Sequence, residues 1–243
     1  MEPLNLSNVN ILSDLNIAIL SPFTQPEKET DLVIFANNRP YVPFYDVRQM
    51  LSKCASYAVK NNVYVVPEKF SLEDSLCLTI LNPKGEPLGI QRSCHLSMSD
   101  RGIFKRDDSI DPIATPFGKI ALLPSVDMNI PYVRTEAVLK GAEFFIASLY
   151  MESYDFSPQR ASLYALNVAQ TTGIPVAAAI GNGGIIVNGD WTLVSPFDMN
   201  EVYGKVSPSQ WRVDHLAVKK GMELLRKYKN LFSEEKTSFK EEN

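Results

Sequence analysis

The sequence predicts an α/β protein, and three observations lead to this class. Short continuous apolar runs, typical of strands buried on both faces, recur along the 243 residues. Segments with apolar residues at helical spacing separate some of these runs, whereas tight turns join others. This mixture predicts two stacked sheets with helices outside, a four-layer αββα sandwich. A doubly wound sheet remains open as an alternative from the pattern alone.

Strands are predicted where a short apolar run ends at turn residues or at proline. The predicted strands cover residues 16–20, 31–35, 63–66, 76–81, 88–92, 120–123, 142–149, 176–180, 185–187 and 191–194. The turn Asn82-Pro83-Lys84-Gly85 predicts a hairpin of strands 76–81 and 88–92. Asn188-Gly189 predicts a second hairpin, of strands 185–187 and 191–194. Gly181-Asn182-Gly183-Gly184 is predicted to be a flexible turn, and 97–112 a loop.

Helices are predicted from apolar periodicity and from terminal signals. They cover about 45–60, 132–139, 157–172 and 210–231. Ser157-Pro158 supplies a cap and a first helical position for the third helix. Residues 1–15 are predicted to be an irregular lead-in, 16–232 a single domain, and 233–243 a charged, disordered tail.

Composition excludes several classes of function. The formal net charge is −4, so no basic excess indicates a nucleic-acid or anionic-membrane partner. No apolar stretch approaches the ~18 residues of a membrane span, and no signal peptide is recognised. Three widely spaced cysteines are typical of a reducing cytoplasm, and two histidines without a Cys-x-x-Cys pair predict no metal site. No cofactor motif is present.

The stretch from Gly118 to Asp127 is the most informative part of the chain. The apolar run 120–123 ends at Pro124, and Ser125 and Asp127 follow at the carboxyl end of that strand. Open α/β sheets place their chemistry at this end of their strands. Ser125 is therefore the first candidate for a nucleophile.

The order of motifs resembles the nitrilase, or carbon–nitrogen hydrolase, superfamily. The pieces that carry the resemblance are Gly85, His95-Leu96, Gly118-Lys119-Ile120, Asp127, Pro131, Gly141-Ala142 and Gly189 through Pro196, and they span about 16–196. The resemblance implies an αββα sandwich, which commonly dimerises. It also implies a cysteine nucleophile, a glutamate base and a lysine that stabilises the tetrahedral intermediate. A thiolate needs a base to take its proton, and the oxyanion needs a cation or donor.

All three catalytic residue types implied by this resemblance are replaced. The glutamate position falls on Asn37, the lysine position on Ser93 and the cysteine position on Ser125. An amide accepts no proton at neutral pH, and a serine without a base is a poor nucleophile. The resemblance therefore implies a nitrilase-like protein that has lost its catalytic triad.

The first layer of the sandwich is predicted to be trimmed. The family places a helix between its first two strands, whereas only residues 21–30 connect them here. A parallel crossover usually needs a dozen or more residues.

One further position departs from the pattern that the resemblance implies. The family has a glutamate after the proline that follows the nucleophile, and here that position is Tyr132.

Four nearby residues are candidate helpers. Glu68, after the third strand, is the acid considered as a substitute base, and Asp127 is a second helper that the resemblance implies to be structural. The resemblance gives His95 a supporting role, with a general base as the alternative. Cys94 is interpreted as a small core residue rather than a reactive thiol.

Three functional hypotheses follow. The favoured one is a catalytically inactive nitrilase-fold protein with a binding or assembly role, in the cytoplasm. The second is a divergent amidase with Ser125 as nucleophile and Glu68 or Asp127 as helper. The third is a regulatory or ligand-binding protein that holds a small amide or carboxylate between Asn37, Ser93 and Ser125. The resemblance implies a homodimer formed by the helices at about 132–140 and 157–172.

Overall fold

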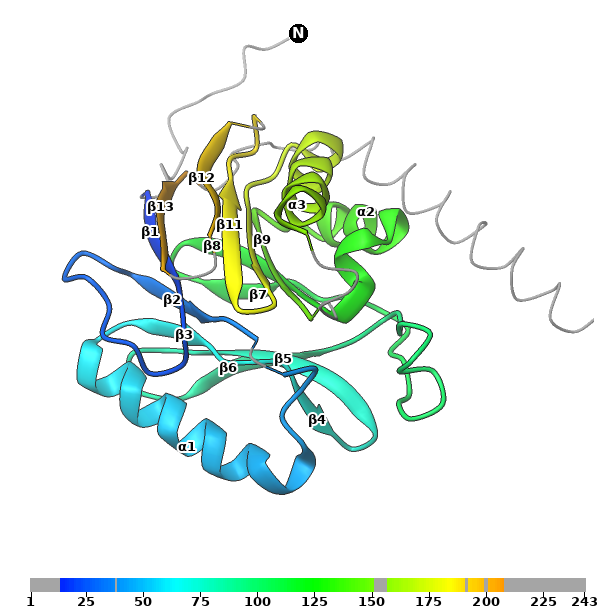
Figure 1. The fold of residues 1–243 in the computed structure, drawn as a ribbon, viewed down its shortest axis with the longest axis horizontal. Coiled ribbons are helices and arrows are strands. Elements are labelled where there is room, and N and C mark those ends of the chain that lie inside the picture. Colours follow the sequence, from blue (N-terminus) through cyan, green and yellow to red (C-terminus); the bar gives the residue numbers. More distant parts are fainter. Residues whose placement is uncertain (1–13, 38, 151–156, 191, 199–200, 208–243) are drawn as a thin grey trace, which may run out of the picture.

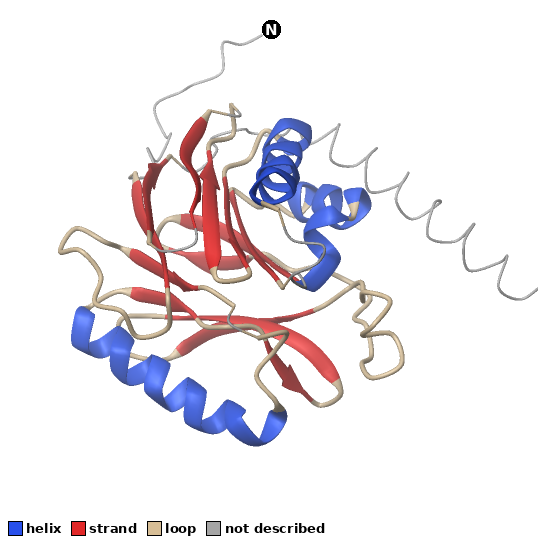
Figure 2. Cartoon of the chain, viewed as in Figure 1, coloured by secondary structure: helices blue, strands red, loops and turns tan. Residues whose placement is uncertain are grey.

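Two β-sheets pack against each other at the centre of the protein (Figures 1 and 2). The computed structural model describes residues 14–37, 39–150, 157–190, 192–198 and 201–207. The first sheet has the order β13 (Val202–Val206), β1 (Leu15–Leu20), β2 (Leu32–Phe35), β3 (Tyr64–Val66), β5 (Ser75–Leu81), β4 (Phe70–Leu72), with β6 (Pro87–Arg92) also paired to β5. The second has the order β12 (Leu193–Asp198), β11 (Gly183–Val187), β10 (Val176–Ile180), β9 (Phe144–Leu149), β8 (Gly118–Pro124), β7 (Ile113–Thr115).

Helices cover the outer face of each sheet, so the predicted four layers are confirmed (Figure 1). Helix α1 (Phe44–Asn61) lies on the first sheet, and α2 (Pro131–Leu139) and α3 (Pro158–Thr172) lie on the second. The 3-10 helix η2 (Ser125–Asn129) connects β8 to α2. Apolar side chains from both sheets form the central cluster, to which Ile19, Leu78 and Ile146 contribute.

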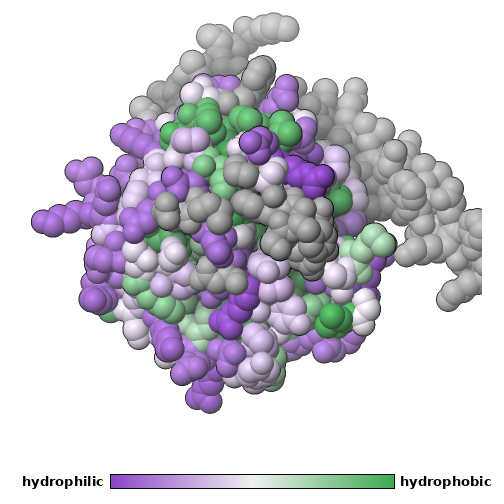
Figure 3. Space-filling model, viewed as in Figure 1, coloured by the Kyte–Doolittle hydropathy of each residue, from purple (hydrophilic) through white to green (hydrophobic). Residues whose placement is uncertain are grey.

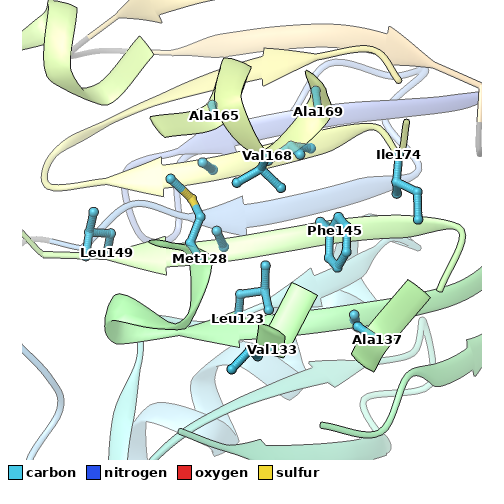
Figure 4. Packing of buried hydrophobic residues seen from close by; sticks show 14 of the residues in the cluster. Leu123, Met128, Val133, Ala137, Phe145, Leu149, Ala165, Val168, Ala169 and Ile174 are labelled. Atoms are coloured by element: carbon cyan, nitrogen blue, oxygen red, sulfur yellow. The ribbon is translucent and has the colours of Figure 1, made fainter. Parts of the chain in front are cut away.

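The helix boundaries follow from local chemistry. Helix α1 buries Val47, Met50 and Cys54 on one face, as the predicted spacing requires, and ends at Asn62 with φ of 54°. The Ser157 side chain accepts a hydrogen bond from the Arg160 N–H at 3.1 Å, which confirms the predicted cap of α3. Figure 4 shows how this helix packs on the second sheet.

The predicted trimming of the first layer is confirmed. Strands β1 and β2 are parallel neighbours, yet residues 21–31 join them without a helix. Phe23 covers part of this region, with its ring 5.2 Å from that of Phe35 and 6.2 Å from that of Tyr57. The Tyr57 hydroxyl also donates to the Thr24 carbonyl at 2.5 Å. An aromatic contact therefore fixes a connection that has no helical hydrogen bonds.

The structure differs from the sequence prediction at several elements. Strands β4, β7 and β13 were not predicted, because the first two have three residues each and the third carries Gly204 and Lys205. Gly183 and Gly184 begin strand β11 instead of belonging to a flexible turn. The helix predicted at 210–231, the tail from 233 and nearly all of the lead-in lie outside the described residues.

Candidate functional site

A pocket of about 460 Å³ lies beside the carboxyl ends of β8 and β9. These parallel neighbours end at one edge of the second sheet, as sheet geometry requires. Side chains from several parts of the chain line the pocket, among them Tyr41, Lys69, Asp100, Ser125, Tyr150 and Tyr164. The pocket therefore lies between the two sheets' loops and α3.

The loop between β6 and β7 forms one rim of this pocket. It confirms the loop predicted over 97–112, apart from strand-like pairing of Lys105 with Ser75. Ile103 and Asp100 line the pocket, and Met98 beside them is 90% exposed. Figure 3 shows a strongly hydrophobic patch at the right of the molecule, where this loop projects in Figure 1.

Ser125 lies in the pocket wall with an unusual backbone conformation. It is the first residue of η2, is almost fully buried and has φ of +55°. Serine rarely adopts this region, and such strain typically costs roughly 1–3 kcal/mol. Its hydroxyl donates a long hydrogen bond, 3.4 Å, to Oδ2 of Asp100. The predicted position of Ser125 at a strand end is thus confirmed.

Asn37 is fully buried just beyond β2 and links the two sheets. Its Oδ1 accepts from the Ser148 hydroxyl at 2.9 Å and from the Lys69 N–H at 3.4 Å. Its Nδ2 donates to the Ala179 carbonyl at 3.5 Å, and its backbone N–H donates to Gly181 at 2.8 Å. Every polar group named here is used inside the protein, so the side chain acts as a bridge between layers.

Ser93 lies behind the pocket and does not line it. Its hydroxyl is within hydrogen-bond distance of the His95 carbonyl, 2.5 Å, and of Oδ2 of Asp127, 3.1 Å. It also lies 3.4 Å from the carbonyl of Pro124, the residue before Ser125. Ser93 thus contacts the end of β8, and Asn37 contacts Ser148 of the neighbouring strand β9. Of Asn37, Ser93 and Ser125, only Ser125 lines the pocket.

Asp127 holds the β6–β7 loop against η2. Its carboxylate accepts from the Cys94 N–H at 3.0 Å, the His95 N–H at 2.6 Å and the Ser93 hydroxyl. Burial raises the pKa of Asp127 to about 7, and these donors together with the Lys69 charge act in the opposite direction. This geometry supports the structural role that the resemblance implies for Asp127.

His95 has its ring next to Tyr132, whose hydroxyl lies 2.5 Å from Nε2. Burial lowers the pKa of His95, and the charges of Arg106 and Arg101 act in the same direction. The ring does not line the pocket. The contact between His95 and Tyr132 connects the β6–β7 loop to α2. This geometry favours a structural role for His95 over that of a general base.

Glu68 does not line the pocket, whereas its neighbour Lys69 does. The Glu68 carboxylate faces Arg39, with Oε2 3.7 Å from Nη2. Sequence reasoning missed Lys69 because it looked for an acid in Pro67-Glu68-Lys69. The two adjacent side chains have different surroundings, because Glu68 faces Arg39 and Lys69 lines the pocket.

Lys69 is a cation in an unusual place, because the residue is only 4% exposed. Burial lowers the pKa of Lys69 to about 8, and the charges of Asp100 and Asp127 partly oppose this effect. Among the described residues, no carboxylate lies within ion-pair distance of the ammonium and none accepts a hydrogen bond from it. The pocket thus contains a strong donor with unused capacity.

The low pKa of Lys69 predicts a pH-dependent stability. The folded chain gives up this proton near pH 8, and the unfolded chain gives it up near the ordinary value of 10.5. Between these values the unfolded chain binds more protons, so the free energy of unfolding rises with pH. We expect Lys69→Met to remove this rise, roughly 1–3 kcal/mol, when the wild-type and variant proteins are unfolded in urea from pH 7 to 10.

The control for this measurement is Lys105→Met, because the Lys105 side chain is 77% exposed. Its curve should follow that of the wild-type protein at each pH. Equal slopes for wild type and Lys69→Met would show that the amine titrates normally in the folded protein.

Other chemistries find little support in the described residues. The cysteines Cys54, Cys77 and Cys94 are buried and form no disulfide, and none lines the pocket. Burial raises the pKa of Cys54 to about 12 and that of Cys77 to about 11, which disfavours their thiolates. No group of three His, Cys, Asp or Glu side chains in the described part could hold a metal ion. None of the described helices is both long and apolar enough to cross a membrane.

Comparison with known sequences gives no match to a protein-family model and none to a curated protein. Solved structures do match. A carbon–nitrogen hydrolase from Helicobacter pylori G27 has a TM-score of 0.69 at 14% identity, covering 90% of this chain and 94% of that one.

An amidase from Nesterenkonia sp. AN1, solved as a mutant after Michael addition of acrylamide at its active-site cysteine, has a TM-score of 0.70 at 13% identity. The match covers 88% of this chain and 99% of that one. Another mutant of this amidase is described as belonging to the nitrilase superfamily. The structural neighbours agree with the resemblance seen in the sequence, and the chain has the αββα fold of carbon–nitrogen hydrolases.

Proposed function

We propose that this protein binds a small molecule in the Lys69–Ser125 pocket and does not hydrolyse carbon–nitrogen bonds. The observation that carries the proposal is the state of Asn37, which stands where the resemblance implies a glutamate base. Its amide is engaged by Ser148, the Lys69 N–H and the Ala179 carbonyl. An amide held in this way binds and positions but takes no proton from a nucleophile.

Ser125 also lacks a suitable base. The carboxylate nearest to its hydroxyl, that of Asp100, already accepts from the Ser97 hydroxyl at 2.5 Å. The Ser125 hydroxyl lies 3.4 Å from the same oxygen, which is a long distance for proton transfer. A serine hydroxyl is weakly acidic, so an ordinary carboxylate at this distance activates it poorly.

The proposal is tested with a panel of small aliphatic amides, nitriles and carbamoyl compounds. We expect ammonia release from the wild-type protein to equal that of Ser125→Ala and of buffer alone. Thermal unfolding of both proteins provides the control that each is folded. Ammonia release by wild type that Ser125→Ala abolishes would overturn the proposal.

A divergent amidase is the second candidate, because one observation favours it. Ser125 keeps a strained backbone, with φ of +55°, in the wall of a pocket that also contains Lys69. Strained backbone gathers at functional sites, and an amine with a pKa of about 8 is partly neutral at pH 8. In this alternative Lys69, rather than Glu68 or Asp127, would assist Ser125.

We also propose that the protein is a homodimer that pairs through α2 and α3. Leu163 on α3 is 64% exposed and Tyr132 on α2 is 38% exposed, so apolar surface is available on both helices.

We also propose that the protein is located in the cytoplasm. The support for this location is that none of the three cysteines forms a disulfide, as expected in a reducing compartment.

A further inference from the structure

The position of Lys69 in the pocket is fixed by its own backbone. Its N–H donates to Oδ1 of Asn37 at 3.4 Å, and its carbonyl accepts from the Val42 N–H at 2.8 Å. Strand β4 begins at the next residue and pairs with β5. The ammonium therefore enters the pocket from a rigid base and is available to a ligand without rearrangement of the main chain.

The ammonium lacks the partners that a buried cation needs. The residue is 4% exposed, and no described side chain or carbonyl accepts a hydrogen bond from it. A buried charge is costly unless it is paired, and an ammonium can donate three hydrogen bonds. A ligand anion would supply the missing partner.

Asp100 adds a negative charge to a pocket wall that also contains the cations of Lys69 and the exposed Arg160. Its Oδ2 accepts from the Ser97 and Ser125 hydroxyls, while Oδ1 receives no hydrogen bond from the described residues. Both residues line the pocket, and Asp100 is not ion-paired with Lys69, so each charge is available to a ligand. A ligand that satisfies both needs an acceptor at one end and a donor at the other.

We infer that the pocket binds a small organic acid, whose carboxylate accepts from the Lys69 ammonium and whose hydroxyl or amino group donates to Asp100. The volume of about 460 Å³ accommodates such a molecule and leaves room for a larger substituent. A second carboxylate that lies against Asp100 is repelled, and this disfavours a short dicarboxylic acid held between Lys69 and Asp100. The inference rests on the proposed binding function and names the class of ligand.

The experiment uses the full chain and three probes of similar size, namely lactate, the neutral lactamide, and succinate. Binding is measured by calorimetry and by the shift in melting temperature, with each probe at concentrations up to roughly 10 mM. We expect lactate to bind and to raise the melting temperature. Lactamide should bind about 10- to 100-fold more weakly, which is the effect of losing one hydrogen bond to a charged group. Succinate should also bind about 10- to 100-fold more weakly, because its second carboxylate is repelled by Asp100.

Two lysine variants test the assignment to Lys69. Lys69→Met should weaken lactate binding about 10- to 100-fold, and Lys105→Met, at an exposed lysine outside the pocket, should bind lactate as wild type does. A further variant, Asp100→Asn, should reduce the preference for lactate over succinate. Melting curves establish that each variant is folded.

Three results would overturn the inference: equal binding of lactate and lactamide, unchanged binding by Lys69→Met, or no binding of lactate. This failure is distinct from failure of the proposed function. Turnover of amides overturns the proposed function whatever the probes do, whereas absence of both turnover and lactate binding overturns only the ligand class.

Discussion

Asp127→Ala is expected to lower the free energy of unfolding by about 2–4 kcal/mol. The Asp127 carboxylate is completely buried and accepts from two backbone N–H groups and the Ser93 hydroxyl. Alanine leaves these donors without an acceptor inside the protein. Each unsatisfied buried donor costs roughly 1–3 kcal/mol, and relief from burying the carboxylate offsets part of the sum.

Urea unfolding followed by circular dichroism measures this effect, and two variants calibrate it. Asp127→Asn keeps one acceptor oxygen, so its loss should be smaller than that of alanine. Glu29→Ala removes an exposed acid in a surface turn and should stay within about 0.5 kcal/mol of wild type. A loss below about 1 kcal/mol for Asp127→Ala would mean that water replaces the carboxylate as acceptor.

Gly183→Ala is expected to lower the free energy of unfolding by about 2–3 kcal/mol, because the backbone of the neighbouring strand β12 approaches this residue closely. A β-carbon at Gly183 would lie 2.1 Å from the Asp198 carbonyl oxygen and 2.7 Å from the Phe197 ring. The first contact is with backbone of a paired strand, so it cannot be relieved by a side-chain rotation. The two strands must separate locally or Gly183 must shift out of the sheet.

Gly102→Ala is the matched control for this substitution. A β-carbon at Gly102 meets no heavy atom within 4 Å, so the variant should unfold at the same urea concentration as wild type. Both variants add one methyl group, and their difference isolates the close approach of the strands. Equal stability of Gly183→Ala and Gly102→Ala would show that β12 does not pack tightly on β11.

Gly183 also illustrates why part of the fold could not be predicted from the sequence. Four consecutive residues of the type found in turns, Gly181 to Gly184, predict a turn by propensity. In the structure the turn uses only the first two, because Gly183 and Gly184 are small where β12 and β1 approach. A glycine required by tertiary packing has the same appearance in a sequence as a glycine required by a turn.

The layered architecture, by contrast, could be predicted because its signals are local. The apolar face of α1, the Ser157 cap of α3 and the run 120–123 each follow from residues adjacent in sequence. The missing helix between β1 and β2 was also visible, since the length of the connection limits what it can contain.

The candidate site was predictable in part. Ser125 was found because it follows a buried strand, and Asp127 because it lies two residues on. Lys69 and Asp100 were missed, because each comes from a loop whose position depends on contacts far away in sequence. Burial of Lys69 is a property of the packed sheets, and a Pro-Glu-Lys tripeptide in the sequence gives no sign of it.

The pairing of β1 with β13 has a consequence for how the protein folds. Leu15 is paired with Val206, so the edge of the first sheet joins two segments separated by almost the whole described chain. Contacts of such high sequence separation slow folding, because a long loop must close before they form. During synthesis β1 leaves the ribosome long before its partner exists, and until then it presents an unpaired strand edge of the kind that aggregates. The first sheet therefore gains its β13 edge only after Val206 has been synthesised.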